Sequence, residues 1–172
     1  MGIELDATAG DRVIHTGRDI SQIIFLDILP SVKPDIIGDA KYLPFRNSVF
    51  EKIYCDPPHL IRNDRKYWRK TYLRFGNWKN RVEWFRFLNR TNKEFARVLK
   101  PLGLLWYKII DGKDYRVTKR KNLDFYENFE LIEEKRQPTS AGWSTNICWH
   151  LTFKLRSSDT KANENEKTMA DR

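Results

Sequence analysis

Short apolar segments bounded by turn residues recur along the first third of the chain. They cover residues 2–5 (GIEL), 22–28 (QIIFLDI), 34–40 (PDIIGDA) and 50–56 (FEKIYCD). Continuous apolar runs of this kind are typical of strands that are buried on both faces of a parallel sheet. Parallel strands usually need a dozen or more residues of connection. We therefore expect only abbreviated helices or loops between these strands.

A longer amphipathic pattern follows in the middle of the chain. Its apolar positions recur at steps of three and four residues, which predicts a helix, and they are Val82, Phe85, Leu88, Phe95, Ala96 and Leu99. The sequence KPLG at 100–103 is expected to end this helix.

The last third predicts further strands. Residues 104–110 (LLWYKII) have the pattern of a buried strand, and 117–129 have the pattern of a short helix. Two final strands are expected at 130–136 and 145–155. Strands that alternate with helices indicate an α/β fold with an open, Rossmann-like and mostly parallel sheet. We expect one catalytic domain over residues 1–156 and a polar, disordered tail over 157–172.

Composition narrows the class of protein. The chain has 172 residues, the size of one domain, and its 40% hydrophobic content can form a core. It has no run of about 18 apolar residues, so no membrane span is expected. The N-terminus lacks a basic and then apolar signal sequence. Cys55 and Cys148 have no metal-ligand spacing, so the sequence predicts a cytoplasmic protein with two reduced, buried cysteines and no metal site.

Positive charge is concentrated in one segment. The chain carries 32 Lys and Arg against 23 Asp and Glu, a net charge of +9, and residues 61–81 hold eight basic residues and one acid. Aromatic residues are interleaved with these charges, and a smaller basic group follows at 113–122. This pattern favours a polyanion-binding surface. The alternative is a solvated basic face without a ligand.

Acidic residues end or follow each of the first four predicted strands. They lie in Asp6–Gly10, at Asp27, at Asp39 and in Asp56–His59. Because ligands of open α/β sheets bind outside the carboxyl ends of the strands, we expect these residues to lie at one edge of the sheet. The fourth group contains two prolines that cannot continue a strand, which indicates a rigid turn.

The segments LDATAG, FLDI, IIGDA and IYCDPPHL, in this order, resemble the motifs of class I S-adenosylmethionine-dependent methyltransferases. More closely, they are similar to amino-group methyltransferases that carry a (D/N)PP(Y/F/W) motif after the fourth strand, such as small phage and archaeal DNA methyltransferases. The resemblance spans about residues 3–155. It implies the class I methyltransferase fold, with S-adenosylmethionine as the cofactor.

The resemblance also implies roles for the residues at the first three strand ends. They would contact the cofactor, through the loop of Asp6, Ala7 and Gly10, through Asp27 at the ribose hydroxyls, and through Asp39 and Ala40 at the adenine. The family usually has a longer glycine-rich run in the first loop, where this chain has Asp11 and Arg12. Ordinary turns remain the alternative for each of these positions.

Asp56, Pro57, Pro58 and His59 match the family's catalytic motif. The lone pair of an exocyclic amino group is delocalised into the ring, which makes the nitrogen a poor nucleophile. Asp56 and the carbonyl of Pro57 would each accept an N–H, and Pro58 would keep the turn rigid, so that the lone pair points at the methyl group. His59 stands where the family has an aromatic residue that stacks on a flipped base. A structural turn with a surface histidine is the alternative.

The basic segment directly after this motif is the candidate substrate site. Its stacking and phosphate-binding residues would be Arg65, Lys66, Tyr67, Trp68, Arg69 and Lys70. Alternatively, the aromatic residues pack a mobile lid. No catalytic role is assigned to His15, and His150 is expected to be a core or edge residue of its strand.

These observations lead to three hypotheses. The first is an S-adenosylmethionine-dependent N-methyltransferase acting on an exocyclic amino group of a nucleic-acid base, with adenine N6 or cytosine N4 of DNA ahead of RNA. The second is a methyltransferase acting on a protein amide or a small molecule. The third is a nucleic-acid-binding module that has lost catalysis. The chain has no room for a separate recognition domain, so selectivity would come from the basic segment, a partner subunit or a homodimer.

Overall fold

The computed structural model describes residues 2–61, 76–111, 123, 126–138 and 147–157. Three sequence predictions lie outside this part of the chain. They are the substrate segment 65–70, most of the short helix expected over 117–129, and the tail after residue 157.

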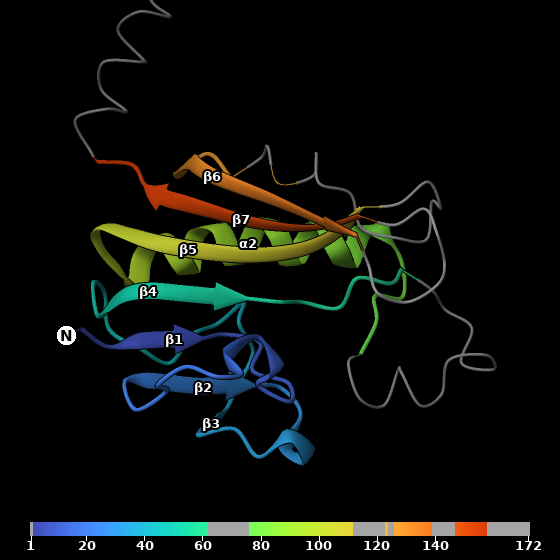
Figure 1. Ribbon diagram of the computed structural model, residues 1–172, viewed down its shortest axis with the longest axis horizontal. Helices are drawn as coiled ribbons and strands as arrows, with labels where there is room; N and C mark the ends of the chain where they lie inside the picture. The colour runs from blue at the N-terminus through green and yellow to red at the C-terminus, as the bar shows by residue number, and fades with distance from the viewer. Residues whose placement is uncertain (1, 62–75, 112–122, 124–125, 139–146, 158–172) are drawn as a thin grey trace, which may run out of the picture.

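The described residues form one seven-stranded sheet with the order β3-β2-β1-β4-β5-β7-β6 (Figure 1). The strands are β1 (Glu4–Asp6), β2 (Ile23–Asp27), β3 (Ile36–Ile37), β4 (Phe50–Cys55), β5 (Leu99–Asp111), β6 (Phe129–Pro138) and β7 (Ile147–Leu155). The pairs from β3 to β5 are parallel, and β7 is antiparallel to both of its neighbours. The predicted mostly parallel α/β sheet is confirmed, and the antiparallel β7 makes it a mixed sheet.

The connections between β1 and β4 are short, as predicted. Within them the structure has only two 3-10 turns, η1 (Val13–His15) and η2 (Pro30–Val32). β3 has two residues instead of the longer strand expected at 34–40. Here the carboxylate of Asp35 accepts the backbone N–H of Phe25 at 2.8 Å, so a side chain takes the place of a longer strand ladder.

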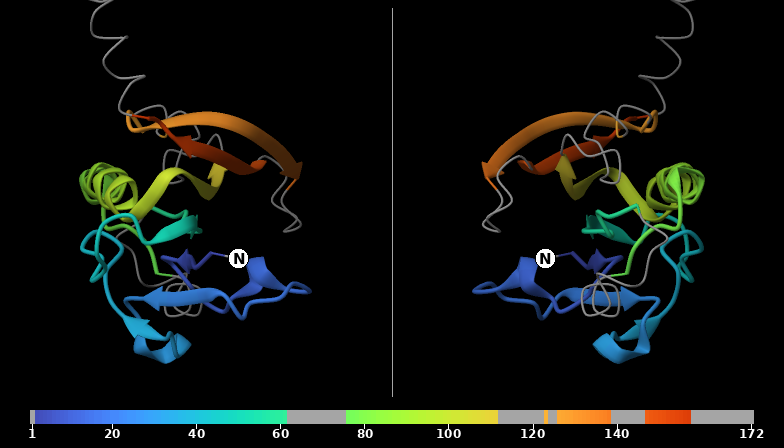
Figure 2. Two further views of the ribbon diagram at one scale, coloured as in Figure 1. Left: turned by 90° about the vertical axis from the view of Figure 1, so that its left-hand side faces the viewer. Right: turned by 90° about the vertical axis from the view of Figure 1, so that its right-hand side faces the viewer.

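The helix α2 (Arg81–Val98) covers one face of the sheet (Figure 2). Its first turn is capped by Asn80, whose side chain accepts the N–H of Glu83 at 3.0 Å. Its buried residues face the sheet, and they are Trp84, Phe87, Leu88, Thr91, Asn92, Phe95 and Val98. The polar Thr91 is satisfied in this core, because its hydroxyl reaches the carbonyl of Phe87 at 2.8 Å.

The amphipathic pattern predicted the helix but placed part of its buried face wrongly. Val82 is 58% exposed and Phe85 is 36% exposed. Steps of three residues from Val82 drift away from the 3.6-residue period of the helix. The true stripe starts at Trp84 and passes through Thr91 and Asn92, two polar residues that the hydrophobic pattern leaves out.

The sequence KPLG ends the helix as expected, but it belongs to β5 rather than to a separate turn. β5 begins at Leu99, and its pairing with β4 is interrupted between Leu99 and Leu104. Leu102 has a φ of 62° within this interruption, which marks an irregular strand start. Both cysteines are free and buried, as predicted. Among the described residues, no helix is long and apolar enough to span a membrane.

Candidate active site

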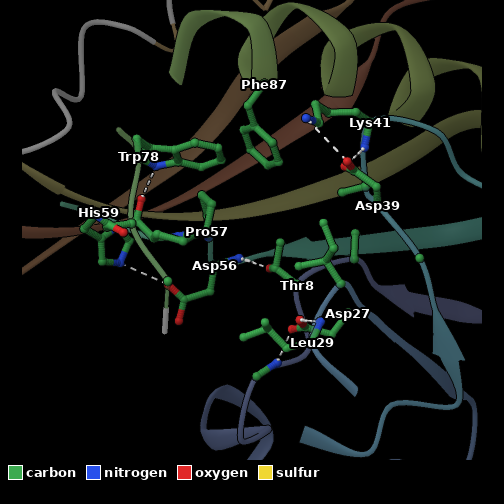
Figure 3. Close-up of a pocket in the computed structure, with 18 of the residues that line it drawn as sticks. Thr8, Asp27, Leu29, Asp39, Lys41, Asp56, Pro57, His59, Trp78 and Phe87 are labelled. Carbon is green, nitrogen blue, oxygen red and sulfur yellow. Dashed lines mark hydrogen bonds and ion pairs between the residues drawn. The ribbon is translucent and has the colours of Figure 1, made fainter. Parts of the chain in front are cut away.

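A cavity of about 370 Å³ opens at the carboxyl ends of β1, β2, β3 and β4 (Figure 3). Most of the residues singled out in the sequence line it, and they are Ala7, Gly10, Asp27, Asp39, Ala40, Asp56, Pro57, Pro58 and His59. In Figure 3, Asp56 and His59 lie on one side of the cavity, Asp39 on the other and Asp27 below. The strand order therefore brings together four groups that are far apart in the sequence.

Asp6 differs from this expectation. Its side chain does not line the cavity but is fully buried, and its carboxylate pairs with Nε2 of His15 at 2.8 Å. Burial raises the pKa of Asp6, and the hydrogen bond from His15 opposes this shift. His15 packs edge-on against Tyr54 at 4.8 Å. The buried Asp6–His15 pair thus supports the β1 loop from behind.

A hydrogen bond between Gly10 and Asp27 connects the loop after β1 to the end of β2. The N–H of Gly10 donates to Oδ2 of Asp27 at 2.9 Å, and the N–H of Leu29 donates to Oδ1 at 2.9 Å. Gly10 has a φ of 47°, a conformation that favours glycine. Each carboxylate oxygen of Asp27 keeps a second lone pair for a ligand.

The third strand end is held by short local bonds. Oδ1 of Asp39 accepts the N–H of Lys41 at 2.9 Å, and the Lys41 ammonium lies 3.4 Å from Oδ2. The loop that follows is tied to α2, because Arg97 donates to the carbonyls of Leu43 at 3.0 Å and Phe45 at 2.7 Å. The helix therefore fixes the position of the Asp39 loop.

The Asp56 carboxylate has partners on both oxygens. Oδ1 lies 3.0 Å from Nε2 of His59, and Oδ2 accepts from the Lys108 ammonium at 2.7 Å. Burial raises the pKa of Asp56, but the hydrogen bond and charge of His59 and the charge of Lys108 outweigh it and hold this pKa below its ordinary range. The Thr8 hydroxyl accepts the backbone N–H of Asp56 at 2.7 Å. Asp56 is thus a fixed, ionised hydrogen-bond acceptor.

Trp78 holds the proline turn in place. Its indole Nε1–H donates to the carbonyl of Pro58 at 2.6 Å, and its backbone N–H donates to the carbonyl of Leu60 at 2.9 Å. The Trp78 ring packs against Phe87 of α2, with 4.8 Å between the ring centroids. The turn is therefore braced by an aromatic cluster on the helix.

Sequence reasoning missed several cavity residues. Among them are Thr8, Ile28, Lys41, Trp78, Phe87 and Lys108. Ile28 is 61% exposed beside Asp27, an apolar surface that a flat ring could cover. Lys108 had a detectable signal, because it is a charged residue inside the apolar run at 104–110.

Other sequence expectations concern residues near the cavity. Cys55 is buried at the end of β4, and this burial raises the pKa of its thiol well above the ordinary value, so the thiol is not nucleophilic. His150 lies in β7, half-buried and edge-on to Trp106 at 5.2 Å. Burial and, secondarily, the charge of Lys108 lower the pKa of His150. Within the described ranges, no group of three or more His, Cys, Asp or Glu is placed to hold a metal ion.

Comparison with known proteins separates fold from activity. No family model and no curated protein matches the sequence. Solved structures do match. The geranyl diphosphate C-methyltransferase from Streptomyces coelicolor, in complex with S-adenosyl-L-homocysteine, has a TM-score of 0.61 at 8% identity, covering 91% of this chain and 71% of that one. The N-methyltransferase NodS from Bradyrhizobium japonicum, also in complex with S-adenosyl-L-homocysteine, has a TM-score of 0.53 at 13% identity, covering 91% and 78%.

This chain has the class I methyltransferase fold. The seven-stranded order with an antiparallel β7 between β5 and β6 and the structural matches agree on this point. A third match, the [4+2]-cyclase SpnF, has a TM-score of 0.58 at 15% identity and covers 91% of this chain and 76% of that one. Since a protein named as a cyclase shares the fold, the reaction has to be inferred from the site.

Proposed function

We propose that this protein is an S-adenosylmethionine-dependent N-methyltransferase. The observation that carries the proposal is that the three cofactor loops and the Asp56–His59 turn line one cavity. The cofactor would lie at the end formed by Gly10, Asp27 and Asp39. The reacting nitrogen would enter at the Asp56 end.

The residues at the first end fit this cofactor chemically. Asp27 is held by two backbone N–H groups and offers two acceptor oxygens to a ribose diol. Ile28 offers apolar surface for an adenine ring, and Asp39, which also lines the cavity, offers an acceptor. When bound, the cofactor supplies an electrophilic methyl group on a sulfonium.

The residues at the second end orient an amino group. The ionised Asp56 carboxylate would accept one N–H of the substrate, and the carbonyl of Pro57, which lines the cavity, would be the second acceptor. Two such acceptors fix the nitrogen so that its lone pair is aligned with the methyl group, which is a contribution of orientation and electrostatics. His59 is 15% exposed at its side chain and offers a flat ring beside the carboxylate.

For the substrate, we favour an exocyclic amino group of a nucleic-acid base, with DNA ahead of RNA. The net charge of +9 and the eight basic residues in 61–81 support a polyanionic substrate. The cavity volume of about 370 Å³ is at the small end of ligand sites. S-adenosylmethionine would fill most of the cavity. The remaining space favours a substrate that inserts only its reacting group.

A small-molecule or protein-amide substrate is the second candidate. The structural matches support it, because the Streptomyces coelicolor protein is named for geranyl diphosphate and none of the matches above is named for a nucleic acid. A binding module without catalysis is the third candidate. It would hold nucleic acid through the basic segment without using Asp56.

The first test is calorimetric titration with S-adenosylmethionine. We expect micromolar binding by the wild-type protein, loss of binding by Asp27→Ala, and unchanged binding by the control Asp19→Ala, an exposed residue outside the cavity. Absence of binding by the wild type, with and without added DNA or RNA, would contradict the proposal.

The second test is transfer of a tritiated methyl group to pools of DNA, RNA, protein and small amines. We expect transfer to nucleic acid and its near-complete loss in Asp56→Ala. Transfer only to protein or small amines would favour the second candidate. Nucleic-acid binding that is unaffected by Asp56→Ala, with no transfer, would favour the binding module.

A further inference from the structure

Lys108 forms the closest ion pair at the reactive end of the cavity. Its ammonium lies 2.7 Å from Oδ2 of Asp56, and both side chains are mostly buried, with exposed fractions of 26% and 21%. Lys108 itself lines the cavity. Lys108 therefore contacts the Asp56 carboxylate, the hydrogen-bond acceptor of the proposed reaction.

The register of the sheet explains why these two residues meet. β4 and β5 are parallel, and Cys55 lies opposite Tyr107. The next residues are Asp56, directly after the end of β4, and Lys108, which is still inside β5, so the two charged side chains lie beside each other. The sheet therefore fixes Lys108, and the end of β4 fixes the start of the turn that carries Asp56.

The charges around Asp56 balance at this end of the cavity. Lys108 neutralises the carboxylate, and His59 occupies its other oxygen at 3.0 Å. On the neighbouring strand His150 lies opposite Lys108, and Lys135 of β6 lies opposite His150. Asp39 is paired with Lys41 at 3.4 Å on the far side. In the described part of the cavity, no unpaired carboxylate at the reactive end remains to bind a cation.

We propose that Lys108 is a positioning and specificity-determining residue, which holds Asp56 as an acceptor and makes the reactive end of the cavity select an uncharged nitrogen over an ammonium. This inference rests on the proposed function. It names a residue that acts through Asp56, and it requires that the reacting nitrogen is conjugated to a ring or a carbonyl.

The chemistry of the step agrees with this selection. The nitrogen lone pair forms the new N–C bond, the C–S bond breaks with its electron pair remaining on sulfur, and one N–H proton leaves. On a conjugated nitrogen that proton is far more acidic after methylation than a carboxylic acid, so it passes to the Asp56 carboxylate and then to solvent. An aliphatic ammonium has a pKa near 10. It would have to lose a proton before attack, and the Asp56 carboxylate, whose pKa His59 and Lys108 hold below its ordinary range, is too weak a base to remove that proton.

The test compares Lys108→Gln and Lys108→Arg with the control Lys100→Gln. Lys100 also forms an ion pair, with Glu51 at 3.1 Å, but outside the cavity. The methyl acceptors are an adenine-containing single-stranded oligonucleotide, a glutamine-containing peptide and sarcosine, a secondary aliphatic amine. We expect the wild type to use one of the first two and to reject sarcosine.

For Lys108→Gln we expect kcat to fall about tenfold or more, with a smaller change in KM, and partial recovery in Lys108→Arg. Loss of the ammonium should also move the acid limb of the pH–rate profile upward, because Asp56 then loses a group that lowers its pKa. In calorimetry, the preference for S-adenosylmethionine over S-adenosylhomocysteine, whose sulfur is uncharged, should rise about threefold, since a carboxylate that has lost its ammonium partner favours the sulfonium. Lys100→Gln should change none of these values.

The outcomes separate the inference from the proposed function. If the wild-type protein binds no S-adenosylmethionine, both are overturned. If it binds the cofactor and transfers methyl groups, but Lys108→Gln keeps the wild-type kcat, pH profile and ligand preference, the inference alone is overturned. Wild-type transfer to sarcosine in preference to the oligonucleotide and the peptide would overturn it as well.

Discussion

The backbone N–H of Gly10 lies 2.9 Å from Oδ2 of Asp27 and joins the loop after β1 to the loop after β2. Because Leu29 donates to the other oxygen, the Asp27 carboxylate is oriented before any ligand arrives. The proposed ribose contact therefore depends on a glycine that does not itself need to touch the ribose.

Gly10→Ala should weaken cofactor binding. At a φ of 47° an added Cβ has only the carbonyl oxygen of Thr8 nearby, at 3.8 Å, so the cost is conformational strain of about 1 kcal/mol rather than a clash. Relaxing this strain would rotate the N–H away from Asp27. Calorimetry with S-adenosylmethionine should show a loss of affinity of about fivefold or more.

Gly17→Ala is the matched control for that variant. Gly17 also has a positive φ, 81°, with open space around it, but it does not line the cavity. Both variants should lose similar thermal stability, and only Gly10→Ala should lose affinity. Equal affinities in the two variants would show that the Gly10–Asp27 bond does not prepare the site.

Trp78→Phe should reduce methyl transfer more than cofactor binding. The change keeps an aromatic ring against Phe87 but removes the 2.6 Å bond to the Pro58 carbonyl. Loss of one such hydrogen bond should cost about 1 kcal/mol of stability. We expect kcat to fall several-fold, measured by tritium transfer, with an S-adenosylmethionine affinity close to that of the wild type.

Trp84→Phe provides the comparison for Trp78. Trp84 belongs to the same aromatic cluster and is fully buried, and its Nε1 has no hydrogen-bond partner in the described structure. Its replacement removes ring volume without removing a bond to the turn. If the kcat of Trp84→Phe is as low as that of Trp78→Phe, the loss is due to packing and not to the Pro58 contact.

Asp56→Asn should change how stability depends on pH. The pKa of Asp56 is lowered in the folded protein, because His59 and Lys108 outweigh the effect of burial. Asp56 then contributes stability at pH values above the unfolded pKa of about 4, and this contribution is lost as pH falls through the lower folded pKa. Denaturation of both proteins from pH 7 to pH 3 measures the difference.

The expected difference in unfolding free energy is constant above about pH 5 and shrinks toward pH 3. Glu51→Gln is a suitable reference, since Glu51 also has a lowered pKa, through the hydrogen bond and charge of Lys100, but lies outside the cavity. A difference between wild type and Asp56→Asn that grows as pH falls would mean that burial dominates at Asp56.

The carboxyl-end rule for parallel strands was sufficient to predict the cavity from Asp27, Asp39 and Asp56, because strand order alone brings these positions together. The same rule failed for Asp6. Side chains alternate along a strand, so Leu5 and Ala7 point to the α2 face whereas Asp6 points to the other face, where His15 binds it. The partner of Asp6 is His15 in η1, a short 3-10 turn that no sequence pattern predicted.

Lys108 and Trp78 show a second limit. Lys108 reaches the site through the register of β4 and β5, and Trp78 through its ring contact with Phe87. Neither residue is part of a local motif. The helix pattern failed at Val82 and Phe85 for a related reason, since the buried polar residues Thr91 and Asn92 are satisfied by tertiary contacts. Periodicity predicts elements, but the partners of polar side chains follow only from the assembled fold.

The order of strands also has a consequence for how the chain folds. β6 and β7 are neighbours in the sequence and pair directly. β1 pairs with β4, which lies much further along the chain, with Glu4 opposite Lys52. Contacts between distant residues form slowly, because loop closure costs entropy before the contact is made. We therefore expect the β6–β7 hairpin to form early and the cavity to form last. A partly folded chain would have no cofactor site, and the cofactor would stabilise only the completed fold.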